Sequence, residues 1–197
     1  MFHGIMSKVA SASAKIITPT DKEVIAFYGV AGGYRPGRPW TDQGVNNSTM
    51  LSAAQKTGYT IDGVHYQAGP YAAIDPTDVA TIKKGIYYLH GMLVGCSLPK
   101  LWYDNFGPGE VWDKTNSGID GGHDVWAYGY NADGVLIATW GKPGTLVTWA
   151  GIAQQCDELD AIAHKDAEIN PVTGRTAQGI LQADWEQDVL ELTGKAA

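Results

Sequence analysis

Cysteine is scarce in this sequence, and its scarcity excludes two kinds of structure. The 197 residues hold two cysteines, Cys96 and Cys156, which are too few for a disulfide framework. No C-x-x-C pair is present, and no two histidines have the spacing of metal ligands, so we expect no metal and no other cofactor. We interpret both cysteines as small buried hydrophobic residues in a reducing, intracellular setting.

Basic clusters and long apolar runs are also missing. The formal net charge is −7 with a pI of about 5.1, and Lys83-Lys84 is the only adjacent basic pair, so we predict no nucleic-acid partner. No apolar run approaches the roughly 20 residues that span a bilayer, so we predict no membrane association. Residues 1–13 lack the charged-then-apolar order of a signal peptide, which argues against secretion by that route.

The aromatic composition is the most unusual feature that is present. Ten tyrosines and seven tryptophans stand against three phenylalanines. Rings with a polar group suit half-buried positions and interfaces. These residues therefore indicate either the aromatic edges of a β-rich core or a dedicated binding surface.

Helical patterns dominate the first part of the chain. An amphipathic stripe predicts a helix over residues 2–14 with no N-cap, formed by Phe2, Ile5, Met6 and Val9. Thr20 and Glu23 form a capping box, and we expect the helix that it opens to end at Gly29. A further helix is predicted over residues 47–56.

Strand patterns dominate the second part. We predict strands over residues 61–67, 71–74, 92–98, 123–131, 135–140, 145–148 and 159–163, and helices over residues 79–89, 149–155 and 177–192. Residues 100–120 have no clear period and are interpreted as a long loop. The predicted fold is α+β, with an N-terminal helical lobe packed on a C-terminal antiparallel, barrel-like sheet and a C-terminal helix. We expect a single domain over residues 1–197, mainly helical over 1–58, mainly sheet with one helix over 59–165, and a tail with a closing helix over 166–197.

One pair of segments carries the chemistry. Gly121-Gly122-His123-Asp124-Val125 stands at the start of a predicted strand, and Ala138-Thr139-Trp140-Gly141 ends the strand that follows the hairpin. This order resembles papain-like cysteine peptidases, in which a Gly-x-x-His-Ala-Val strand supplies a base and an Asn-Ser-Trp-Gly segment supplies the amide that orients it.

A closer resemblance is to uncharacterised papain-like proteins encoded by phages and prophages, and it covers nearly the whole chain. It rests on runs that are similar to that group's, namely Gly129-Tyr130-Asn131-Ala132-Asp133-Gly134, Thr139-Trp140-Gly141, Cys156-Asp157-Glu158 and Gly174-Arg175-Thr176.

The resemblance assigns roles to individual residues. His123 matches the base, and the nucleophilic cysteine would open the first helix, just ahead of Met1. Ala138 stands at the position of the orienting Asn, where its methyl group can hold nothing. Asp124 would point to the opposite face of the strand from His123. His123 is therefore interpreted as the remnant of a catalytic base, with site neighbours Gly121, Gly122, Ala138, Thr139, Trp140 and His3.

No other cysteine or histidine in the chain fits a catalytic role. Cys96 lies in an apolar strand, and the acidic residues after Cys156 would raise the pKa of its thiol. His65 alternates with apolar residues, His90 ends a helix, and His164 is expected to be exposed.

Two hypotheses about function follow. The first is a non-catalytic papain-like pseudoenzyme that acts as a structural or binding protein, as a phage virion component located in the virion or the host cytoplasm. Its partner would be a protein or a virion assembly. The second is a cysteine peptidase or amidase whose nucleophilic cysteine lies upstream of Met1.

Overall fold

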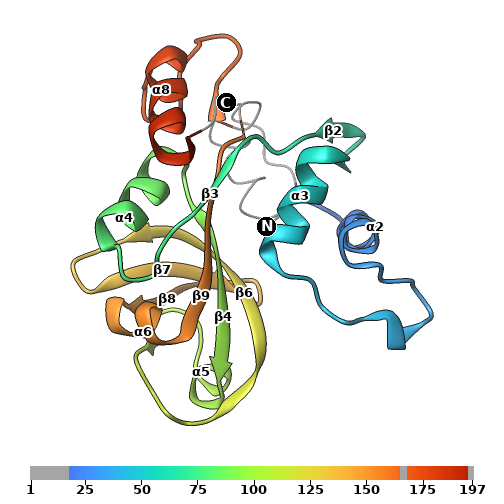
Figure 1. The fold of residues 1–197 in the computed structure, drawn as a ribbon, viewed down its shortest axis with the longest axis vertical. Coiled ribbons are helices and arrows are strands. Elements are labelled where there is room, and N and C mark those ends of the chain that lie inside the picture. The colour runs from blue at the N-terminus through green and yellow to red at the C-terminus, as the bar shows by residue number, and fades with distance from the viewer. Residues whose placement is uncertain (1–17, 165–167, 195–197) are drawn as a thin grey trace. The chain divides into compact units, whose positions relative to one another are not determined.

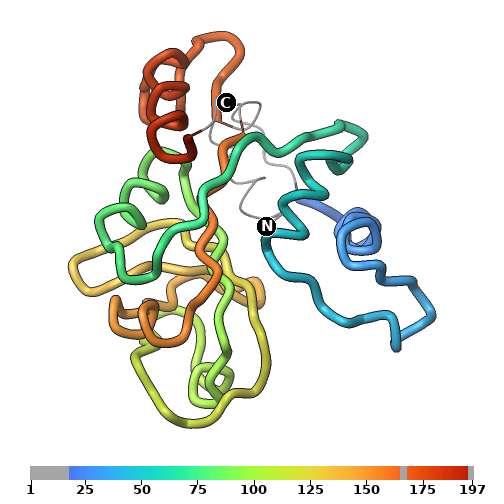
Figure 2. Tube along the Cα trace, in the orientation of Figure 1, coloured from blue at the N-terminus to red at the C-terminus, as the bar shows by residue number. Residues whose placement is uncertain are grey.

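A computed structural model describes residues 18–164 and 168–194, which divide into two compact units. The first unit is Ala72–Ile162, and the second contains the described residues on either side of it (Figure 2). The helix predicted over residues 2–14 lies outside the described residues, and the domain boundaries predicted from the sequence stay predictions. Within the described ranges no helix is both long and apolar enough to cross a membrane.

The first unit is built on a seven-stranded sheet in the order β3-β9-β4-β6-β7-β8-β5. Figure 1 shows β4 lying beside β6 and β9. The strands are β3 (Tyr71–Ala73), β4 (Met92–Pro99), β5 (Val111–Trp112), β6 (Ile119–Tyr130), β7 (Gly134–Thr139), β8 (Lys142–Thr148) and β9 (Cys156–Ile162).

This sheet is open, so the prediction of a barrel-like sheet is wrong, although the mixed content agrees with the predicted α+β class. A barrel needs its two end strands to pair. Here the end strands β3 and β5 have only three and two residues and do not pair with each other. The sheet is also not purely antiparallel, because β5 pairs with β8 in parallel.

Three helices accompany the sheet: α4 (Val79–Tyr88), α5 (Lys100–Asp104) and α6 (Trp149–Gln155). The helix α4 packs against β6 and β9, and α6 packs against β4, β8 and β9. The strand β4 is buried along almost its whole length, which explains its continuous apolar sequence. The largest fully buried side chains of this unit include Trp102, Trp112, Leu89, Met92, Leu93 and Ile137.

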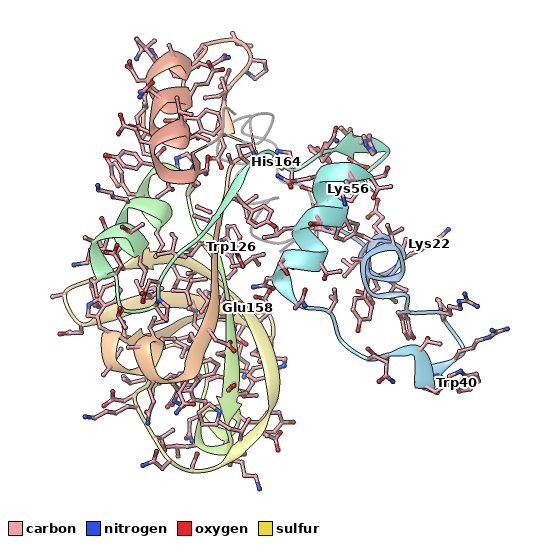
Figure 3. The ribbon with its side chains drawn as sticks, in the orientation of Figure 1. Lys22, Trp40, Lys56, Trp126, Glu158 and His164 are labelled. Atoms are coloured by element: carbon pink, nitrogen blue, oxygen red, sulfur yellow. The ribbon has the colours of Figure 1, made fainter. Side chains whose placement is uncertain are left out.

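The second unit contains α2 (Asp21–Gly32), the 3₁₀ helix η1 (Pro39–Thr41), α3 (Asn47–Lys56), β1 (Tyr59–Ile61), β2 (Val64–Tyr66) and α8 (Gln182–Thr193). The predicted capping box is confirmed, because Thr20 Oγ1 accepts from Glu23 N and the Glu23 carboxylate accepts from Thr20 N. The helix α2 packs against α3 and β1. Trp40 on η1 is 69% exposed and points away from the other elements of its unit (Figure 3).

Two predicted helix ends are wrong. The helix α2 passes through Gly29 and ends at Gly32, where Gly33 adopts the left-handed conformation and donates to the Gly29 carbonyl. Gly29 is needed for a close approach, since a Cβ there would lie 2.9 Å from the Tyr34 carbonyl oxygen. The last helix begins at Gln182 because residues 176–180 form a turn, closed by the bond from Thr176 N to the Ile180 carbonyl.

Two further segments differ from their predictions. Residues 100–120 are only partly a loop, since they contain α5, β5 and the first residues of β6. The strand predicted over residues 61–67 is half of a hairpin, in which Asp62 and Gly63 both have positive φ and turn the chain between β1 and β2.

Candidate functional site

His123 lies inside the long strand β6, four residues after the strand begins at Ile119. The prediction that it opens the strand is therefore wrong, because β6 starts to pair with β4 before it reaches the histidine. On its other edge β6 pairs with β7 only from Trp126 onward. The imidazole thus projects from the part of β6 that precedes this second pairing.

The His123 ring is held by a hydroxyl group. Its Nε2 atom lies 2.7 Å from Oγ1 of Thr139, the last residue of β7. Thr139 is buried, with 4% of its surface exposed. A hydrogen bond to one ring nitrogen fixes the tautomer and the orientation of an imidazole. Thr139 therefore positions the His123 ring through Nε2, and Nδ1 is the ring nitrogen that this contact leaves out.

Ala138 stands where the resemblance would place an orienting Asn, and it pairs with Trp126 and Pro143 on the neighbouring strands. Its methyl group can accept no hydrogen bond, as the sequence indicated. The sequence named Thr139 as a neighbour but missed its contact with the ring. The sequence feature that could have indicated this contact is the hydroxyl of Thr139. It lies one residue after Ala138, at the end of the strand that follows the histidine strand.

Trp140 covers the face of the imidazole. The two rings stack with their centroids 4.1 Å apart and an interplanar angle of 14°. Trp140 has a positive φ of 43°, and Gly141 follows with 74°, so the pair forms a tight turn between β7 and β8. Positive φ is uncommon for a bulky residue. This turn places the indole against His123.

Three further aromatic rings contact Trp140 and form an aromatic cluster with this stack. Phe106 lies 4.6 Å from Trp140, Tyr103 lies 5.6 Å from it and Trp112 lies 6.4 Å from it, all measured between ring centroids. Trp112 is buried, whereas Trp140 and Tyr103 are 43% and 52% exposed. The cluster therefore has a buried base and an exposed rim.

Burial by these neighbours lowers the pKa of His123 below its usual value. The imidazole is accordingly neutral at pH 7. A neutral, oriented imidazole is the form that acts as a general base.

The two glycines before His123 leave free space beside β6. A Cβ built on Gly121 or Gly122 would meet nothing within 4 Å, and both residues are exposed. Asp124 is exposed too and faces Gly95 across β4. His3, the remaining predicted neighbour, lies outside the described residues.

The two cysteines are buried, as the sequence predicted. Cys96 is the cross-strand partner of His123, but its Sγ lies 3.4 Å from the His123 carbonyl oxygen and donates to it. Cys156 hydrogen-bonds Cys96, and this bond, burial and the charge of Asp157 raise the pKa of the Cys156 thiol well above its usual value. Cys156 is therefore protonated at neutral pH.

His164 corrects a prediction, since it is fully buried rather than exposed. It belongs to the second unit, where its Nε2 lies 2.9 Å from the hydroxyl of Tyr59. Its ring also lies 5.9 Å from that of Tyr66. His164 thus forms part of an aromatic core.

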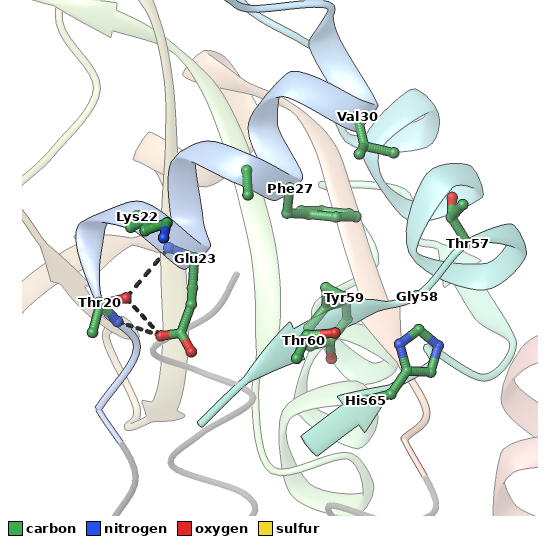
Figure 4. A pocket seen from close by; sticks show the side chains of 11 residues that line it. Thr20, Lys22, Glu23, Phe27, Val30, Thr57, Gly58, Tyr59, Thr60 and His65 are labelled. Carbon is green, nitrogen blue, oxygen red and sulfur yellow. Dashed lines mark hydrogen bonds between the residues drawn. The ribbon is translucent and has the colours of Figure 1, made fainter. Parts of the chain in front are cut away.

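The second unit also holds a cavity of about 520 Å³ between α2 and the β1–β2 hairpin (Figure 4). Phe27 and Tyr59 line it, and His65 lies at its edge. The Glu23 carboxylate is fully engaged by Thr20 and the Asp62 amide, which lowers the pKa of Glu23.

No group of three or more metal-ligating side chains occurs within residues 18–164 and 168–194.

Comparison with known proteins identifies the fold of the chain. No family model matches the sequence, and no curated protein matches it. A solved structure does: that of a cysteine protease from Carica candamarcensis in complex with E-64. The TM-score is 0.53 at 13% identity, covering 82% of this chain and 86% of that chain.

This chain therefore has a papain-like fold. At 13% identity the likeness shows the fold alone.

Proposed function

We propose that this chain is a non-catalytic papain-like module that binds a protein partner, as a structural component of a phage particle. The observation that carries the proposal is the placement of its two thiols. Both Cys96 and Cys156 are buried in the sheet, at 4% and 5% exposure.

Thiol catalysis needs a thiolate within reach of the base. Cys96 directs its S–H to the His123 backbone rather than to the ring. Cys156 has a raised pKa and neighbours Cys96. The imidazole is held by Thr139, but Cys96 bonds the backbone of His123 and Cys156 bonds Cys96, so neither thiol donates to the ring.

The exposed rim of the aromatic cluster is the surface that would bind the partner. Tyr103 and Trp140 are large, exposed and fixed by ring contacts to each other. Rigid aromatic side chains are enriched at protein interfaces and among their energetic hot spots. The assignment to a phage particle, and to the virion or host cytoplasm, rests on the sequence resemblance described above.

Hydrolysis assays test the non-catalytic part. The purified 197-residue protein is incubated with peptide and amide substrates, beside a His123→Ala variant. We expect both to match the buffer blank. Turnover by the wild-type protein that His123→Ala abolishes would contradict the proposal.

Particle composition tests the structural part. Density-purified particles of the source phage are analysed for peptides of this chain, and Trp140→Ala is compared with Trp40→Ala. We expect the chain in wild-type particles, with incorporation about tenfold lower for Trp140→Ala and unchanged for the exposed control. Particles without the chain would refute the structural role, and equal incorporation of the two variants would refute the surface.

A second candidate is a cysteine peptidase or amidase whose nucleophile is encoded upstream of Met1. The bond between His123 and Thr139, together with the lowered pKa of His123, favours it, because these features keep a base competent. Reading the upstream codons tests it. An in-frame cysteine whose extended protein hydrolyses substrates, with activity lost in His123→Ala, would establish it, and an intervening stop codon would remove it.

A further inference from the structure

The two cysteines occupy directly opposed positions on neighbouring antiparallel strands. Cys96 of β4 pairs with Cys156 of β9, beside an irregularity in the register after Gly95. Opposed residues in such a pair have Cα atoms about 4.5–5.5 Å apart and side chains on the same face. Disulfide bonds join residues whose Cα atoms lie about 4.4–6.8 Å apart, a range that includes the usual spacing of such opposed residues.

The two thiols are also in contact. A side-chain hydrogen bond between them is the main cause of the raised pKa of Cys156. Cys96 in turn donates to the His123 carbonyl oxygen. The side chains therefore point toward each other rather than apart.

We propose that Cys96 and Cys156 form a disulfide bond when the folded protein meets a peroxide, which makes the pair an oxidation-dependent tether between β4 and β9. One thiolate attacks the peroxide, the O–O bond breaks, and a sulfenic acid and water result. The second thiolate attacks that sulfur, the S–O bond breaks, and a second water leaves. In total two thiols and one hydrogen peroxide give one disulfide and two waters.

The disulfide bond would constrain the strands around His123. It closes a loop of about 60 residues, which contains β6, β7 and β8, and such a constraint lowers the entropy of the unfolded chain. It also consumes the S–H that donates to the His123 carbonyl. Because both sulfurs are buried and Cys156 is protonated at neutral pH, the reaction should be slow and should accelerate with rising pH.

The test uses the folded wild-type protein and dilute hydrogen peroxide. After quenching, the protein is unfolded in an alkylating reagent and digested without reductant. We expect one cross-linked peptide pair that joins Cys96 to Cys156, faster formation at pH 8.5 than at pH 6.5, and a Tm several degrees above that of the reduced protein. Cys96→Ser keeps a donor for the His123 carbonyl and should show neither the cross-link nor the rise in Tm.

Three results would overturn the proposal. The first is a folded protein in which both thiols stay alkylatable under peroxide that oxidises the unfolded chain. The second is oxidation to separate sulfinic acids or to disulfide-linked dimers in place of the internal bond. The third, a cross-link that leaves Tm unchanged, would refute the tether. None of these depends on whether the chain is an enzyme or a virion component.

Discussion

The Nε2 atom of His123 and the Oγ1 atom of Thr139 lie 2.7 Å apart and come from adjacent strands of one sheet. The contact brings together two residues that the chain separates by a complete hairpin. Trp140, next to Thr139, stacks on the same ring. One strand end therefore both bonds the edge of the imidazole and covers its face.

Replacing Thr139 tests whether its hydroxyl positions the ring. We expect wild-type protein and Thr139→Ser to hold His123 in one tautomer, because both keep a hydroxyl at this place. Thr139→Val has nearly the same shape without the hydroxyl, so it should show a mixture of tautomers. Long-range ¹H–¹⁵N correlation spectra of the imidazole report the tautomer directly. A single unchanged tautomer in Thr139→Val would show that stacking on Trp140 is sufficient.

The pH dependence of stability tests the lowered pKa of His123. Burial puts the folded pKa below the unfolded value of about 6.5, so the unfolded state binds the proton more readily. Stability from this residue is thus fully present above about pH 6.5 and is lost as the pH falls through that value toward the lowered folded pKa. Urea unfolding of wild type and His123→Gln is measured between pH 5 and 8. The free energy of unfolding of the wild type minus that of the variant should shrink or change sign as the pH falls. A parallel pair of curves would contradict the lowered pKa, and His123→Asn should reproduce the His123→Gln result.

The sequence predicted those parts of the fold that local chemistry determines. The capping box at Thr20, the helix over residues 47–56 and the apolar strand of β4 all depend on side-chain type and spacing within a few residues. The open sheet was missed because closure depends on how two short strands, β3 and β5, pair at a distance. The sequence predicts a helix end at Gly29, because the close approach of that residue to Tyr34 is a tertiary contact with no local signal.

The candidate site was predicted in the same partial way. The order of segments identified His123, Thr139 and Trp140 as neighbours. It did not identify Thr139 as the hydrogen-bond partner, because the sheet register decides which residue of β7 reaches the ring. The pairing of Cys96 with both His123 and Cys156 depends on register as well and has no signal in sequence spacing.

The hairpin between β1 and β2 offers a test of backbone conformation. Gly58 and Gly63 both have positive φ, 65° and 73°, so alanine at either should cost about 1–2 kcal/mol. At Gly58 a Cβ would also lie 2.4 Å from the Tyr66 carbonyl oxygen and 2.5 Å from Nε2 of His65, whereas at Gly63 it would meet nothing. We expect Gly58→Ala to lose at least about 1 kcal/mol more than Gly63→Ala in urea unfolding. Equal losses would show that the hairpin shifts to admit the methyl group.

The stacked pair of Trp102 and Trp112 tests how much the base of the aromatic cluster stabilises the first unit. The two rings lie 4.8 Å apart at an angle of 11°, and each side chain is 1% exposed. The Trp112 indole N–H donates to the Asn105 carbonyl and that of Trp102 to the Asp113 carbonyl, so both polar groups are satisfied.

Trp112→Ala removes a buried ring and leaves a cavity beside Trp102, so we expect a loss of about 3–5 kcal/mol in the free energy of unfolding. Trp40→Ala is the matched control, because Trp40 is 69% exposed, and it should change stability by less than about 0.5 kcal/mol. Urea unfolding followed by far-UV circular dichroism measures both. The loss of Trp112 should also free Trp140, whose ring it contacts, and lower the order of the His123 ring in the same spectra that report its tautomer. If Trp112→Ala instead left the His123 signals unchanged while it destabilised the unit, the buried pair would support the sheet without holding the imidazole stack.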